Sequence, residues 1–156
     1  MNESPKQHLR THGKYHFMRV FLDFDGVLHP VGGSTLPFEH LPSFEEFLRK
    51  HPEVQVVISS SWRETFGVDY IRETFFSFDV QQQIIGGTPS LPNCYRYDEV
   101  QTHIEQSGYK GDFIVIDDDA GQFPPAWPPL LLCNPSEGLT HEKLKELLHR
   151  IRGNLK

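Results

Sequence analysis

Short apolar runs alternate with segments of helical periodicity from residue 18 onward. The runs are rich in Val, Ile, Leu and Phe, as strands are, and each is bounded by polar residues, Gly or Pro. They therefore predict strands, with a short edge strand at "QIIGG". The predicted strands lie at residues 18–24, 54–59, 83–87, 112–118 and 129–133.

The segments between these runs predict helices. Ser43, followed by Glu46 three residues on, has the pattern of a capping box, so we expect a helix to begin at Ser43. The "GQFPPAWPP" segment has four prolines and predicts an irregular loop. Apolar residues with the spacing of a helix face are Val68, Ile71, Phe75 and Phe78, then Val100 and Ile104, then Leu144, Leu147, Leu148 and Ile151.

This alternation predicts an α/β fold. Parallel strands joined by helical crossovers form a sheet with helices on both faces, so we expect a three-layer, Rossmann-like domain. Residues 18–156 fit one domain of this kind. Residues 1–17 are polar, and we expect them to form a loose tail or an added edge element.

The composition excludes several functional classes. A net charge of −6 argues against broad electrostatic binding to nucleic acid or anionic membranes, although a few placed cations could still recognise one phosphate. No apolar run is long enough to span a membrane, and residues 1–17 lack the apolar core of a signal peptide. Cys94 and Cys133 have no CxxC partner, so we expect no disulfide framework and a cytoplasmic location.

Acids and hydroxyls stand where three predicted strands end. Asp23 and Asp25 follow the first strand, residues 59–61 are serines after the second, and residues 117–119 are aspartates after the third long run. Because ligands bind beyond the carboxyl ends of such strands, we expect these side chains to share one site. Gly26 permits a sharp turn or a close backbone approach just after the second acid.

Carboxylates gathered in this way repel one another and acquire raised pKa values unless a cation joins them. Their hard oxygen ligands suit Mg²⁺, which proteins commonly hold with one or two carboxylates, waters and a substrate phosphate. A lone aspartate would be explained better as a helix cap or turn residue. Three strands that all end in acids or hydroxyls favour a metal and phosphate site.

Three segments resemble motifs of the haloacid dehalogenase (HAD) superfamily. "LDFDGVLHP" is similar to its first motif, hydrophobic-DxDGx[TV]; "VVISSSWR" is similar to the second, a strand ending in Ser or Thr; and "FIVIDDD" is similar to the fourth, a strand ending in an acidic pair. The resemblance covers about residues 18–155. Within the superfamily the chain looks most like the small HAD domains associated with RNA repair proteins.

The resemblance implies a Mg²⁺-dependent phosphatase. Asp23 would be the nucleophile that forms an aspartyl-phosphate, and Asp25 would protonate the leaving oxygen and then activate water. The implied Mg²⁺ ligands are the side chain of Asp23 and the backbone carbonyl of Asp25, with Asp117 or Asp118 completing the site.

The second motif supplies a hydroxyl for a phosphate oxygen. The resemblance favours Ser60, two residues before Trp62, with Ser59 as the alternative. Arg63 could hold a substrate phosphate with two hydrogen bonds, or form a structural salt bridge at a helix start, and the sequence does not decide between these roles. We expect Trp62 to be a packing residue. The residues assigned to substrate binding are Gly26, Ser59, Ser61 and Arg63.

The third motif requires a cation at the start of the helix before the third long strand. Arg96 in "CYRYDEV" stands there, and Lys110, just before the strand, is the weaker candidate. HAD enzymes often carry a cap domain, but the connections in this chain leave room for one helix each. We therefore expect no large cap, only a small flap in residues 29–38 beside an open site.

The leading hypothesis is hydrolysis of a phosphomonoester, which is either a small molecule, such as a nucleotide, or a nucleic-acid end. A phosphate-accepting signalling receiver also gathers acids above a parallel sheet, but the DxDG pattern and the second acid favour hydrolysis. A degenerate binding module is a third alternative, although every expected catalytic position is filled. No membrane and no obligate protein partner are expected.

Overall fold

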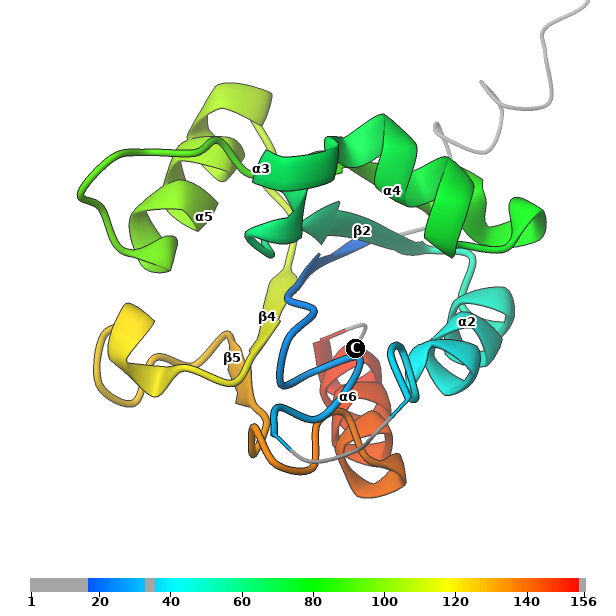
Figure 1. Ribbon diagram of the computed structural model, residues 1–156. Coiled ribbons are helices and arrows are strands. Elements are labelled where there is room, and N and C mark those ends of the chain that lie inside the picture. The colour runs from blue at the N-terminus through cyan, green and yellow to red at the C-terminus, as the bar shows by residue number, and fades with distance from the viewer. Residues whose placement is uncertain (1–16, 33–35, 155–156) are drawn as a thin grey trace, which may run out of the picture.

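The structure, a computed structural model, describes residues 17–32 and 36–154. Its centre is a five-stranded sheet in the order β3-β2-β1-β4-β5, with all neighbouring strands parallel (Figure 1). The strands are β1 (Met18–Leu22), β2 (Val54–Ile58), β3 (Ile84–Gly87), β4 (Phe113–Asp117) and β5 (Leu130–Leu132). The α/β prediction is confirmed, and "QIIGG" is an edge strand as expected.

The connections between strands are mostly helical. They contain α2 (Leu41–Lys50), α3 (Trp62–Phe66), α4 (Val68–Phe75), the 3₁₀ helix η1 (Phe78–Gln83), α5 (Arg96–Ser107) and the 3₁₀ helix η2 (Ala120–Gln122). The last helix, α6 (His141–Asn154), follows β5. No large cap domain is evident among the described residues, as predicted.

Helices cover both faces of the sheet, so the domain has three layers. One core cluster packs the side chains of Leu22 and Ile58 with those of α2, α4 and α6. On the other face Phe21 and Val57 pack with α5 and with Phe123. Strands buried on both faces read as continuous apolar runs, which is why β1, β2 and β4 were visible in the sequence.

The start of α2 differs from the prediction. The helix begins at Leu41, with His40 at the N-cap, so Ser43 lies inside the first turn and makes no capping box. Pro42 explains the earlier start, because its fixed φ and missing N–H suit the first turn of a helix.

The end of α4 also differs. The helix stops at Phe75 because Phe76 is extended, with φ −96° and ψ 140°. Phe76 enters the core in place of Phe78, whose side chain is 88% exposed. The prediction that Phe78 belongs to the apolar face of this helix is therefore wrong.

The two cysteines are free, Cys94 exposed and Cys133 buried. None of the helices in residues 17–32 and 36–154 has both the length and the apolar character that crossing a membrane requires.

Candidate active site at the carboxyl edge of the sheet

The register of the sheet brings polar side chains from three strands into one row. Leu22 pairs with Ile58 in β2 and with Ile116 in β4. The next residues along these strands are Asp23, Ser59 and Asp117, and they are the polar row. Side chains at matching positions of neighbouring strands point to the same face, which here is the face covered by α5.

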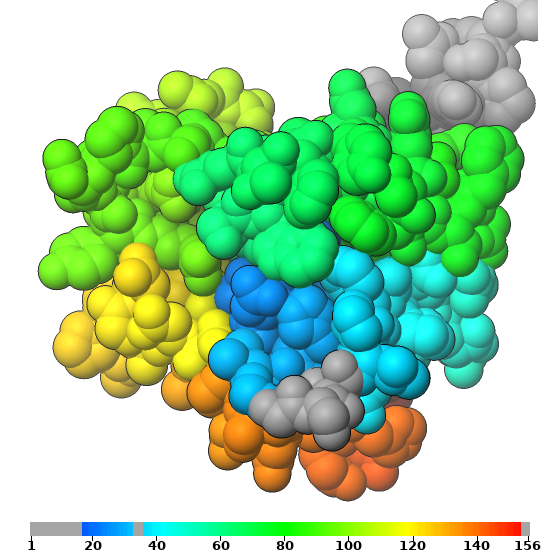
Figure 2. All heavy atoms as spheres, viewed as in Figure 1, coloured from blue at the N-terminus to red at the C-terminus, as the bar shows by residue number. Residues whose placement is uncertain are grey.

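The row lies where the strand order changes direction. β1 connects through α2 to β2 on one side, whereas β4 pairs with β1 on the other side. Open α/β sheets bind ligands beyond the carboxyl ends of the strands at such a switch point. An open cavity of about 370 Å³ lies there, and in Figure 2 the residues after β1 reach the surface between α3 and the segment after β4. Its lining residues are Asp23, Asp25, Ser61, Arg96, Asp118, Asp119 and Pro135.

Three carboxylates and one guanidinium form the centre of this site. Asp23, Asp117 and Asp118 each offer an oxygen, and these oxygens lie within 4.8 Å of one another. The Arg96 Nη1 donates to Asp117 Oδ2 at 2.7 Å and lies 3.3 Å from Asp23 Oδ2. Of the two candidate cations, the structure brings Arg96 into the site, whereas Lys110 precedes β4 at the opposite edge of the sheet.

One guanidinium does not balance three carboxylates. Burial, and after it the nearby Asp117, raise the pKa of Asp23 to about 8, against the opposing effect of Arg96. Burial raises the pKa of Asp117 as well, again against the effect of Arg96. With all three acids ionised the cluster has a charge of −2, so a divalent cation with a preference for oxygen ligands fits this donor set.

Gly26 allows the segment after β1 to approach β4. Its φ is +74°, and a Cβ atom at this position would overlap the carboxylate of Asp118. Both reasons given for a glycine from the sequence, a turn and a close approach, therefore apply.

The register and the hydrogen bonds favour Ser59 over Ser60 as the second-motif hydroxyl. Ser59 is fully buried in the polar row, and its Oγ has no hydrogen-bond partner among the described residues. The Oγ of Ser60 instead accepts the backbone N–H of Trp62 at 3.2 Å. A buried hydroxyl without a partner can accept or donate a new hydrogen bond, whereas the residue of this serine run that lines the cavity is Ser61.

Asp25 is held by two side chains from different elements. Its Oδ1 lies 2.7 Å from His29 Nε2, and its Oδ2 accepts from Trp62 Nε1 at 3.1 Å. The Phe38 backbone N–H donates to His29 Nδ1 at 3.3 Å, so Nε2 is the protonated nitrogen and donates to Asp25. The Asp25 side chain stays 54% exposed and open to the cavity.

Sequence reasoning missed His29 as a partner of Asp25. The two residues are four apart and form an isolated bridge in a tight turn, and "DGVLHP" contains that spacing. Trp62 was expected to pack, and it does contact Phe24, Phe38 and Phe75. Its indole N–H also reaches Asp25, which the sequence gave no means of predicting.

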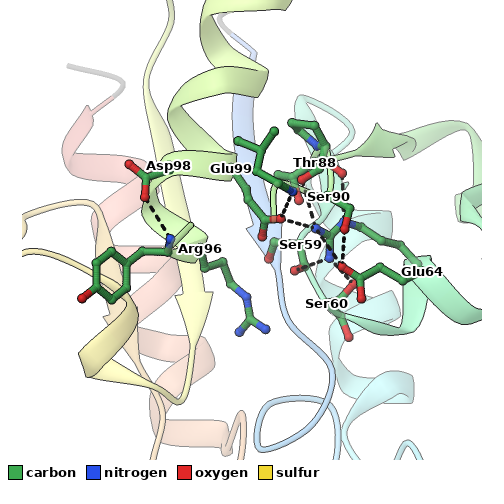
Figure 3. A network of polar contacts seen from close by, with 12 residues as sticks. Ser59, Ser60, Glu64, Thr88, Ser90, Arg96, Asp98 and Glu99 are labelled. Carbon is green, nitrogen blue, oxygen red and sulfur yellow. Dashed lines mark hydrogen bonds and ion pairs between the residues drawn. The ribbon is translucent and has the colours of Figure 1, made fainter. Parts of the chain in front are cut away.

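Of the two roles that the sequence left open for Arg63, the structure shows the structural one, because its donors are engaged within the protein. Its side chain is 6% exposed and donates to four backbone carbonyls and to Glu99 Oε2 at 3.0 Å. Figure 3 shows this network between α3, the segment after β3 and α5, with Arg96 projecting from the start of α5 outside it. The carbonyl acceptors are those of Ser59, Ser60, Thr88 and Pro89.

A model of the HAD domain in Swiss Army Knife RNA repair proteins matches residues 19–144. The chain belongs to this family. The match confirms the resemblance read from the three motifs and includes every residue of the polar row. HAD domains are of phosphohydrolase type, and the family generally uses Mg²⁺. No curated protein matches the chain.

We expect Gly26→Ala to damage the site more than its backbone strain alone accounts for. A residue with a Cβ in the left-handed region costs roughly 1–2 kcal/mol, and here the Asp118 carboxylate must also move. Urea unfolding and a titration of activity against Mg²⁺ should show both losses. Gly32→Ala is the matched control, because Gly32 has φ +82° but no atom of the described residues lies within 4 Å of a Cβ there. An equal rise in Mg²⁺ requirement in both variants would contradict this role.

The raised pKa of Asp23 predicts a pH-dependent stability in EDTA. The folded protein holds this proton up to about pH 8, whereas the unfolded chain releases it near pH 4, so this group's contribution to stability falls as pH rises between these values. Asp23→Asn should therefore be more stable than the wild type at pH 8, and this advantage should be smaller at pH 5. Urea unfolding at both pH values measures this.

Added Mg²⁺ should reduce the advantage of Asp23→Asn at pH 8, since the cation stabilises the ionised carboxylate. Glu142→Gln, at an exposed acid of α6, controls for the loss of one negative charge. Equal stability of the wild type and Asp23→Asn in EDTA at pH 8 would show that the Asp23 carboxyl does not destabilise the folded protein at that pH.

Proposed function

We propose that this HAD domain is a Mg²⁺-dependent phosphatase that removes the phosphate of a phosphomonoester through an aspartyl-phosphate on Asp23. The observation that supports this most is the pairing of two different acids at one cavity. Asp23 is buried beside Arg96, Asp117 and Ser59, whereas Asp25 is half-exposed and held by neutral donors.

In the first step an Asp23 carboxylate oxygen attacks phosphorus and the ester P–O bond breaks. Asp25 gives its proton to the leaving oxygen, so the alcohol departs neutral. In the second step Asp25, now a carboxylate, takes a proton from water as the water oxygen attacks phosphorus. The bond between phosphorus and Asp23 breaks, and inorganic phosphate leaves.

The other residues of the site bind and orient the phosphoryl group. Arg96 would offset charge next to the nucleophile, and the unpartnered Ser59 hydroxyl would bind a phosphate oxygen. The side chains of Asp23, Asp117 and Asp118 would hold Mg²⁺, with the carbonyl of Asp25 as a further ligand. When bound, this ion neutralises charge on the phosphoryl oxygens and so favours in-line attack.

We expect Asp23→Asn to fold and to lose essentially all turnover, since an amide cannot displace an alkoxide from phosphorus. The wild type should lose activity in EDTA and recover it with Mg²⁺. Phosphate release from 4-nitrophenyl phosphate and from a panel of nucleotides, sugar phosphates and 5′-phosphorylated oligonucleotides measures both. Turnover by well-folded Asp23→Asn would exclude the covalent route. A stable phosphoprotein that never turns over would indicate a receiver.

We expect His29→Ala to impair the proton transfers of Asp25 while leaving the affinity for the substrate nearly unchanged. General acid catalysis contributes roughly 10²- to 10⁴-fold, so loss of orientation should slow cleavage of an alkyl phosphate about tenfold or more. Phosphoenzyme formation from 4-nitrophenyl phosphate needs little help from an acid and should be largely spared. A burst of 4-nitrophenol followed by slow turnover would show that the first step is spared and the second is slowed.

His29→Gln keeps an N–H donor and should recover part of the rate. His141→Ala, at an exposed histidine where α6 begins, is the matched control. Equal slowing of the first step for alkyl and aryl phosphates in His29→Ala would contradict a role through Asp25.

A further inference from the structure

A second cavity, of about 270 Å³, adjoins the site where α5 begins and η2 ends. Three aromatic residues, Tyr95, Tyr97 and Phe123, line it together with Gly121, Gln122 and Pro124. In Figure 2 the start of α5 and the segment after β4 lie side by side at the rim of the viewed face. The mechanism proposed above uses none of these residues.

This cavity is directly connected to the phosphate end of the site through Arg96. Tyr95 and Tyr97 flank Arg96 in the chain, and neighbouring Cα atoms are about 3.8 Å apart. The Gln122 Oε1 accepts the Arg96 backbone N–H at 3.0 Å. Asp119, which lines the catalytic cavity, accepts the N–H of Gly121, which lines the second one. The linings of the two cavities are therefore joined by two hydrogen bonds and by the chain itself.

Packing fixes two of the three aromatic walls, Tyr97 and Phe123, in advance. Trp127 stacks on Phe123, with ring centroids 5.6 Å apart and planes 8° apart, and meets Tyr97 edge-on at 5.1 Å. The Tyr95 backbone is tied to Asp98, while the residue as a whole is 63% exposed. Rings held in place before binding lose little freedom when a flat ligand stacks on them.

We propose that this cavity, which we call the aromatic pocket, binds the base of a nucleoside monophosphate whose phosphate lies at Asp23. This inference rests on the proposed phosphatase function and names its substrate class. The pocket is smaller than the roughly 300–1,000 Å³ that encloses a whole drug-sized ligand, and so it suits a single ring system. A ribose then bridges from the pocket past Arg96 to the nucleophile.

Charge and packing favour a single nucleotide over a longer strand. The chain has a net charge of −6, which opposes a polyanion beyond the phosphate that Arg96 receives. On the other side of the site Trp62 is already engaged, since it packs against Phe24 and donates to Asp25. The aromatic pocket is therefore the better place for a base.

The test compares kcat/KM for the four 5′- and 3′-nucleoside monophosphates with that for ribose 5-phosphate. We expect the wild type to prefer at least one nucleotide roughly tenfold or more, as expected from base stacking on aromatic side chains. Tyr95→Ala should remove most of that preference, and Tyr95→Phe, which keeps the ring, should retain it. Tyr70→Ala, at a tyrosine of α4 that is 51% exposed, should change nothing.

An unchanged preference for nucleotides in Tyr95→Ala, or an equal loss of it in Tyr70→Ala, would overturn the proposal that the aromatic pocket binds the base. A 5′-phosphorylated oligonucleotide turned over ten times better than the mononucleotide would overturn the single-nucleotide assignment. Calorimetric binding of the same ligands to Asp23→Asn with Mg²⁺ gives a readout independent of turnover. If no phosphate ester is hydrolysed, the proposed function fails, and the binding ratio still decides the pocket.

Discussion

The charge balance at the end of β1 is the constraint on which the site depends. Three carboxylates meet within a few ångströms at the edge of a buried sheet, and one guanidinium partly offsets them. The core on both faces supplies the free energy that keeps these acids in place. Such an arrangement is unfavourable for the protein alone and favourable once a cation and a phosphoryl group are shared among the acids.

A second ion pair keeps this arrangement in register. Arg63 joins the carbonyls that follow β2 to Glu99 in α5, so the helix that carries Arg96 is tied to the strand that carries Ser59. Leu91 also donates to Glu99, which leaves little polar capacity of this buried pair unused. The pair sets the separation between the cation and the hydroxyl, although neither of its members lines the catalytic cavity.

The sequence revealed most of the sheet because β1, β2 and β4 are buried on both faces and contain little except branched apolar residues. It also placed Asp23, Asp25, Asp117 and Arg96 at one edge, because parallel strands deliver their carboxyl ends together. The start of α2 was missed because Pro42 and His40 offer a start two residues earlier than the capping pattern. In each of these cases the deciding information was local.

Where long-range contacts decide, the sequence was less informative. Ser59 and Ser60 differ only in register, and register is known once β2 is paired with β1. Arg63 and Glu99 are 36 residues apart, so the buried role of the arginine was not predictable from its place after a serine run. The contact of Trp62 with Asp25 spans 37 residues and needs the same tertiary information.

The absence of a large cap among the described residues has a consequence for the fate of the covalent phosphate that we propose on Asp23. Lids in other enzymes exclude competing nucleophiles during the lifetime of an intermediate. Here the cavity is open and Asp25 is half-exposed, so a hydroxyl group of a solute can approach the phosphoryl group as freely as water does. The phosphate would then be partitioned between water and other acceptors according to their concentrations. At high concentrations of an acceptor, the domain would transfer the phosphoryl group to it as well as hydrolyse it.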